Sequence, residues 1–247
     1  MKAEPAAQAR LLDLQELDLE IQRLDHRAAT LPEAEEAARA SELADRLDRE
    51  LIAAQTRLSD AERAQRKAEN DVEQVRSRAA RNTERLESGR ITNGKELQNL
   101  QSEIASLGRR QGELEEIVLE VMEQVESLSS EVARLTAAVD RARVDHTAKV
   151  AHRDTVAAEI GLDRARAVEN RQRVSEDVPA PLLSFYDKLR AQYSGVGAAP
   201  LRHGRCEGCK IVLSPAEIGE IRSAAPDEVV RCEECRRILI RISEPEA

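Results

Sequence analysis

Four cysteines, arranged as two close pairs, are the residues of this chain whose spacing most clearly predicts chemistry. One C-x-x-C pair is Cys206 and Cys209, the other is Cys232 and Cys235, and 22 residues separate them. Two short turns that supply four thiolates are the arrangement that tetrahedral zinc requires. We therefore predict that these four cysteines bind one structural Zn²⁺. Four thiolates leave no coordination position for a reactive water molecule.

Three other interpretations of the cysteines remain open: two disulfides, an iron site of similar geometry, and a redox-active pair. Disulfides are typical of secreted proteins, and the first ten residues contain no apolar secretion core. The cysteine pairs also lack the aromatic-rich strands of a redox fold. Zinc, which adds no redox hazard in a cytoplasm, is the interpretation that the sequence favours.

Short elements around the cysteines must hold them in place. Residues 211–213, 228–231 and 238–242 predict strands. Ser214 and Glu217 match a capping box that begins a helix ending near residue 224. Because so small a module has little apolar core, we expect its folding to depend on the metal. Several cations predict a basic face on it: Arg202, Arg205, Lys210, Arg231, Arg236, Arg237 and Arg241.

Most of the remaining chain has apolar residues at alternating steps of three and four, the period of a coiled-coil seam. One series runs over residues 43–86 and a second over residues 97–139. The glycines and Asn93 between them tolerate left-handed backbone angles and let the chain reverse near residues 88–95. Small residues such as Ala54 should then face larger ones such as Leu128. The fold class predicted is an all-α, long antiparallel coiled-coil hairpin with a small C-terminal α+β zinc ribbon.

Prolines mark the other boundaries. The first helix should open near Pro5, and Pro32 predicts a break or kink at residues 31–32. Pro179 and Pro181 should end the second long helix. Residues 182–190 then predict a short helix, and glycines with Pro200 predict a flexible link. The expected domains are a hairpin over residues 1–178, a collar helix and linker over 179–201, and a zinc ribbon over 202–247.

Composition and charge exclude several classes of protein. One Phe, two Tyr and no Trp are too few to build an ordinary globular core in 247 residues. The net charge of −9 argues against general affinity for nucleic acid. No apolar run approaches the roughly 18 residues of a membrane-spanning helix. We therefore expect a cytoplasmic protein without membrane contact.

Basic residues gather at the predicted hairpin turn. Residues 74–95 hold six cations against only Glu84 and Glu87. Such an end could bind phosphate or an acidic protein surface, although no aromatic residue lies there to stack on bases. The alternative is a solvated helix end whose arginines pair with nearby glutamates. The six cations are Arg76, Arg78, Arg81, Arg85, Arg90 and Lys95.

No catalytic group can be assembled from these residues. Residues 89–95 match the G-x-x-x-x-G-K of a phosphate-binding loop, but Glu96 replaces the required Ser or Thr and no strand precedes the loop. His146 and His152 have no second metal ligand one turn away, and His203 is not needed as a zinc ligand. We predict no enzyme activity, no catalytic residue and no small-molecule substrate.

These features together resemble a bacterial family of coiled-coil hairpin proteins with a C-terminal C4-type zinc ribbon. The resemblance is carried by LLDLQELDLEIQRLDHRAATLP, ITNGKELQNLQSEI, FYDKLR, CEGC and CEECRRILI. The family pattern has glycine after a cysteine pair and an aromatic residue in the last strand, where this chain has Lys210, Arg236 and Ile240. We expect Lys210 and Arg236 to hold positive φ angles without glycine, at about 1 kcal/mol each.

The resemblance implies a non-enzymatic adaptor or scaffold that binds protein partners, as a monomer or homodimer. Some relatives are linked to RNA or to transcription and secretion components. A nucleic-acid-binding accessory factor in transcription or translation is therefore the alternative. Salt dependence separates the two, because phosphate contacts release counterions.

Overall fold

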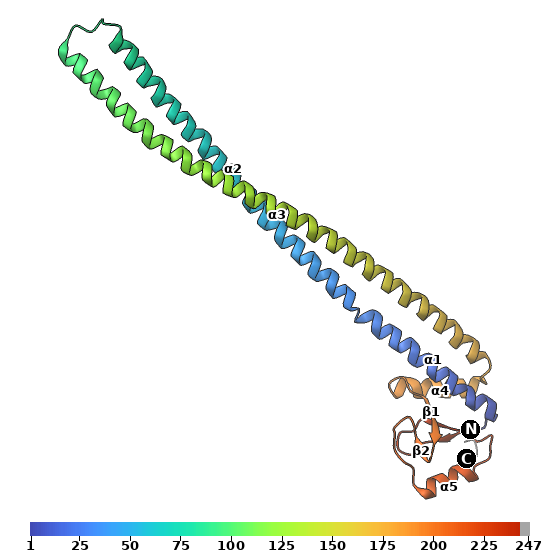
Figure 1. Ribbon diagram of the computed structural model, residues 1–247. Coiled ribbons are helices and arrows are strands. Elements are labelled where there is room, and N and C mark those ends of the chain that lie inside the picture. The colour runs from blue at the N-terminus through green and yellow to red at the C-terminus, as the bar shows by residue number, and fades with distance from the viewer. Residues whose placement is uncertain (243–247) are drawn as a thin grey trace. The chain divides into compact units, whose positions relative to one another are not determined.

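The computed structural model describes residues 1–242 (Figure 1). The chain forms two compact units. Glu35–Val150 form one unit, and Met1–Ala34 form the other with the chain from Ala151 onward. The helices are α1 (Pro5–Ala29), α2 (Pro32–Glu87), α3 (Gly94–Glu176), α4 (Ala180–Gln192) and α5 (Pro215–Ser223). The strands are β1 (Ala198–Arg202), β2 (Arg205–Cys206), β3 (Val230–Arg231) and β4 (Ile238–Arg241).

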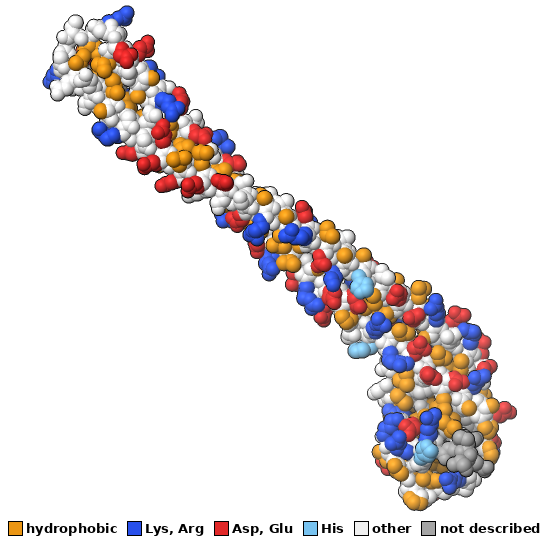
Figure 2. Space-filling view, in the orientation of Figure 1, with side chains coloured by type: hydrophobic (Ala, Val, Ile, Leu, Met, Phe, Trp, Pro, Cys, Tyr) orange, Lys and Arg blue, Asp and Glu red, His pale blue; other side chains and the backbone are white. Residues whose placement is uncertain are grey.

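Within the first of these units, α2 and α3 form the predicted antiparallel hairpin. The seam of α2 is built from alanines, and Ala54, Ala61 and Ala68 are buried. Leu114 and Leu135 are buried on α3. Ion pairs connect the two helices, and charged side chains of both signs surround the hydrophobic ones (Figure 2). Small residues on α2 let the two backbones approach, as the sequence pattern indicates.

The second unit is organised around α1. The break at residues 31–32 is confirmed, because α1 ends at Ala29 and α2 begins at Pro32. Leu24 and Leu31 pack against Val156 and Ile160 of α3. Closer to the N-terminus, Leu11 and Leu14 form the fully buried face of α1.

A four-stranded sheet lies against α1 and α4. Its order is β2-β1-β4-β3, with β1 parallel to β4 and the outer pairs antiparallel. Ala198, Ile238 and Ile240 pack with α1 and α4, whereas Ala199 and Leu239 join the cysteine cluster on the opposite face. The sheet therefore connects the helical core to the metal centre.

Two sequence predictions about this sheet are wrong. Residues 198–200 form part of a central strand instead of a flexible link. Residues 211–213 form no strand beyond an isolated bridge between Val212 and Arg205. The predicted helix with its Ser214–Glu217 capping box is confirmed as α5. The alanines and proline of β1 have low strand propensity, so local sequence gives no sign of its position.

The N-terminal residues extend the edge of the ribbon next to β3. Lys2 forms a bridge with Glu228, the Ala3 amide donates to the Asp227 carbonyl at 2.8 Å, and the Val229 amide donates to the Met1 carbonyl at 3.0 Å. The N-terminal residues are thus joined by backbone hydrogen bonds to the segment that precedes β3.

A buried carboxylate holds the helices of this unit together. The Asp18 side chain on α1 is 1% exposed. It accepts hydrogen bonds from Tyr186 Oη at 2.7 Å, Arg171 Nε at 2.9 Å and Arg190 at 2.7 Å. Burial, followed by the hydrogen bond to Asp18, raises the pKa of Tyr186, so its hydroxyl remains a donor. Asp18 thereby connects α1 to both α3 and α4.

We predict that Asp18→Ala destabilises this unit by about 3–5 kcal/mol, because it removes the buried acceptor of Tyr186, Arg171 and Arg190 and leaves the two arginines only the more exposed Asp187. Both tyrosines of the chain, Tyr186 and Tyr193, lie in this unit. Tyrosine fluorescence during urea unfolding therefore reports on it selectively. The exposed pair of Asp25 with Arg164 supplies the control, and Asp25→Ala should cost about 1 kcal/mol or less. Equal losses for the two variants would contradict the role of Asp18.

Candidate metal centre

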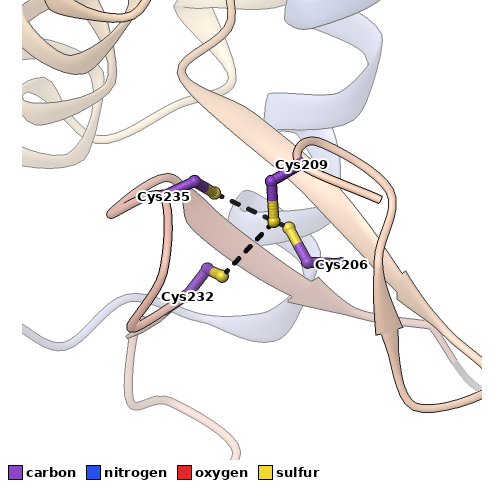
Figure 3. Close-up of side chains that lie close together, drawn as sticks. All are labelled: Cys206, Cys209, Cys232 and Cys235. Carbon is purple, nitrogen blue, oxygen red and sulfur yellow. Dashed lines mark hydrogen bonds between the residues drawn. The ribbon is translucent and has the colours of Figure 1, made fainter. Parts of the chain in front are cut away.

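The four cysteines meet on the face of the sheet opposite α1. Their sulfur atoms all lie within 4.8 Å of one another, and Figure 3 shows them converging. Cys206 Sγ and Cys235 Sγ are 3.8 Å apart, and Cys209 Sγ and Cys232 Sγ are 3.9 Å apart. A tetrahedral site with Zn–S bonds of about 2.3 Å places its sulfur atoms about 3.8 Å from one another. The cluster therefore suits one structural zinc ion.

The sulfur distances also decide against the disulfide interpretation. A disulfide needs sulfur atoms about 2.05 Å apart, and all four cysteines are free. Cys206 and Cys232 are buried, whereas Cys209 and Cys235 are partly exposed. A metal held by these side chains is surrounded by protein on one side and lies close to the surface on the other.

Each cysteine pair sits on a tight turn that requires a left-handed residue. Lys210 and Arg236 have φ angles of 64° and 62°, which confirms the expectation for both residues. The Lys210 amide donates to the Cys206 carbonyl at 2.8 Å, and the Arg236 amide donates to the Cys232 carbonyl at 2.9 Å. The same turn aims the backbone amides of Gly208 and Cys209 at the Cys206 sulfur. These donors stabilise a thiolate.

Protons compete with a metal for the two buried thiols. Burial raises the pKa of Cys206 to about 12, and burial likewise raises the pKa of Cys232. Zinc must displace these protons in order to bind, so its affinity falls as the solution becomes more acidic.

Residues outside the cysteine pairs hold the ribbon against the helices. Gln15 Oε1 accepts hydrogen bonds from the amides of Gly197 at 2.7 Å and Ala198 at 3.2 Å, which fixes the start of β1. The guanidinium of Arg237 donates to the Val196 carbonyl at 3.0 Å and also reaches Gly208 in the first cysteine turn. Gln15 cannot be identified from the sequence, because one more glutamine in a Glu- and Gln-rich helix carries no signal.

The ribbon cations do not form the single basic face that the sequence suggests. Arg237 and Arg241 donate to backbone carbonyls, and Arg241 alone reaches five of them around the end of α5. Glu207 forms ion pairs with Arg205 and Lys210, which lower the pKa of that carboxyl through hydrogen bonds from Lys210 first and Arg205 second. These charges serve the internal structure of the ribbon.

The six cations at the hairpin turn divide into two groups. Arg76, Arg78 and Arg85 form ion pairs across the hairpin with Glu115, Glu103 and Glu96 of α3, at 3.2, 2.6 and 2.7 Å. The other three are exposed, and within the described residues none has an ion pair: Arg81, Arg90 and Lys95. Only the second group has free charge available to a partner.

A long helical hairpin followed by a four-cysteine ribbon defines the class of this protein. Residues 14–194 match the CT398-like coiled coil hairpin domain, and residues 205–239 match the C4-type zinc ribbon domain. The chain belongs to the CT398-like coiled-coil hairpin family, which confirms the family resemblance and the fold class.

Relatives and solved structures agree with this assignment. The chain is 34% identical to an uncharacterised protein of Mycobacterium tuberculosis, Rv2229c, over 98% of both chains. A solved structure from Mycobacterium smegmatis is similar at 33% identity, with a TM-score of 0.81 over 98% of this chain and all of that one. CT398 from Chlamydia trachomatis, at 18% identity and a TM-score of 0.66 over 96% and 98% of the two chains, shares the fold.

These findings bear on function only coarsely. A coiled-coil hairpin and a zinc ribbon are non-catalytic domains that fit a structural or interaction role. In the part of the chain that the structure describes, no helix combines the length and apolar character that crossing a bilayer requires.

We predict that Cys209→Ser lowers zinc affinity by at least about tenfold, because one thiolate of four is lost. Elemental analysis should give one zinc per wild-type chain and a substoichiometric amount in the variant after dialysis against a weak chelator. Glu234→Gln, an exposed change within the second cysteine turn, is the control and should retain the metal. Full zinc in the Cys209 variant would contradict the four-thiolate site.

Strain at the left-handed positions can be tested separately. Arg236→Gly should stabilise the zinc-loaded ribbon by up to about 1 kcal/mol, because glycine adopts positive φ without steric cost. Resistance to zinc extraction by a chelator measures the effect. Glu234→Gly, in the same turn but without positive φ, should make extraction easier. The proposed strain is absent if both glycine variants respond alike.

Proposed function

We propose that this protein is a non-enzymatic adaptor that binds other proteins. The observation that carries the proposal is the metal centre, in which four converging thiolates leave a zinc ion no open position. The metal then serves to shape the ribbon surface and not to perform chemistry. Because all four cysteines belong to this cluster and none forms a disulfide, we propose that the protein works in the reducing cytoplasm.

The turn of the hairpin is the first binding surface that we propose. Arg81, Arg90 and Lys95 are exposed and carry charge that no described ion pair neutralises. Cations in this setting bind acidic side chains or phosphate. An acidic protein surface is favoured, because no aromatic residue is present to stack on bases and three of the six cations are already paired.

Nucleic-acid binding is the second candidate, and the same three unpaired cations support it. Its signature is the response to salt. Each phosphate contact on duplex DNA should contribute a slope of about −0.9 to the change of log affinity with log salt concentration. An acidic protein surface lacks the condensed counterions of duplex DNA, so its affinity should fall less steeply with salt.

The two candidates can be separated by affinity capture with the zinc-loaded protein, with and without nuclease. We expect partners to survive nuclease and to be lost in the triple variant Arg81→Ser, Arg90→Ser, Lys95→Ser. The matched control is Arg76→Ser, Arg78→Ser, Arg85→Ser, which removes the same charge from residues that already have partners and should retain capture. Loss of all partners on nuclease treatment would overturn the adaptor proposal in favour of nucleic acid.

A further inference from the structure

A groove of about 680 Å³ lies between α1 and β1, and neither the metal centre nor the hairpin turn uses it. Its apolar lining is formed by Leu12 and Leu19 of α1 with Ala198 and Pro200 of β1. Leu19 is 37% exposed, although Leu11 and Leu14 on the same helix are fully buried. Helix α1 thus presents two leucines, Leu12 and Leu19, on a face that the fold leaves partly open to solvent.

The shape of the groove suits an elongated occupant. Residues 12, 16, 19, 23 and 26 of α1 all line it, and their spacing of four and three places them on one helix face. At 1.5 Å per residue this line is about 21 Å long. The groove is open along its side, which suits a partner helix better than an enclosed small molecule.

A partner strand is less suitable, because β1 offers few free backbone groups. Pro200 has no amide hydrogen, and its carbonyl accepts from the Glu207 amide at 3.1 Å. The amides of Gly197 and Ala198 already donate to Gln15. An added strand would find little to pair with, whereas a helix satisfies its own backbone and needs only side-chain contacts.

The charges that border the groove indicate the chemistry of the partner. Arg23 and Arg202 line it, and no ion pair within residues 1–242 involves either side chain. Arg23 donates to the Leu19 carbonyl through Nε, so the two terminal nitrogens of its guanidinium remain available to a partner. Glu16 is the one acidic residue in the lining. The groove is therefore apolar around Leu12 and Leu19, with Glu16 between them, and basic at the end where Arg23 lies.

We propose that this groove binds an amphipathic helix of a partner protein, with the apolar stripe of that helix on Leu12, Leu19 and Pro200 and its acidic residues against Arg23 and Arg202. The proposal rests on the proposed adaptor function and gives it a second, separate binding surface. Recognition combines apolar burial with charge complementarity, as in other complexes in which a helix occupies a groove.

Two fluorescent peptides of about 14 residues, the length of the groove in helical form, provide the test. Both carry leucines at helical spacing, and one has glutamates where the other has lysines. Fluorescence anisotropy should show saturable binding of the acidic peptide to the zinc-loaded full chain. Leu19→Glu should weaken that binding by at least about tenfold. Arg23→Glu with Arg202→Glu should weaken it similarly and favour the lysine peptide.

The matched control is Leu162→Glu, which places the same charge at an α3 leucine that is 61% exposed and lies outside the groove lining. It should bind the acidic peptide as the wild type does. Zinc content and circular dichroism establish that each variant is folded. Three results would each overturn the proposal. The wild type could bind the two peptides equally, the Leu19→Glu variant could bind the acidic peptide as tightly as the wild type does, or neither peptide could bind saturably.

Sedimentation velocity tests whether the groove is instead occupied by a second copy of this chain. A wild-type dimer that Leu19→Glu dissociates and Leu162→Glu does not would also overturn the proposal, because the groove would then be a self-association surface. The peptide test can fail while the Leu19→Glu protein still captures its cellular partners. That result would reject the groove as a binding site and leave the proposed adaptor function standing.

Discussion

The fold depends on one turn of α1 that carries two buried polar side chains. Asp18 accepts hydrogen bonds from Tyr186, Arg171 and Arg190, and Gln15 accepts from the backbone at the start of β1. Burying a carboxylate is costly unless several donors compensate it. Here the donors come from α3 and α4, so the cost is offset only when all three helices are in place. The same turn therefore specifies both the helix packing and the position of the sheet.

The zinc site adds a constraint that is local to the opposite face of the sheet. The cysteines lie on turns next to β2 and β4, while Ile238 and Ile240 of β4 belong to the apolar core with α1. The ribbon consequently draws stability from two sources, thiolate coordination on one face and helix packing on the other. A free-standing ribbon of this size would have only the first. Arg237 connects the two faces, because its guanidinium donates to the carbonyl of Gly208 in the first cysteine turn and to that of Tyr193 at the end of α4.

The sequence predicts what depends on periodicity or on a motif, and misses what depends on distant packing. The seam, the break at Pro32, the reversal near Asn93 and the zinc ligands all follow from local pattern. Strand β1 does not, because Ala198, Ala199 and Pro200 favour no strand until β4 pairs with them. Asp18 looks like one more surface carboxylate, since its three donors are 153 to 172 residues away in the chain.

The basic hairpin turn shows the same limit in its charge. A window of sequence counts six cations, but Arg76, Arg78 and Arg85 find glutamates 39, 25 and 11 residues further along, on the facing helix. Exposed pairs of this kind contribute little to stability. They nevertheless neutralise three of the six cations that could otherwise bind a partner. The charge that remains for the proposed partner is that of Arg81, Arg90 and Lys95. Arg23 and Arg202 beside the groove are likewise without an ion pair within residues 1–242. Pairing in the folded structure, and not charge density along the chain, therefore decides which cations are available to a partner.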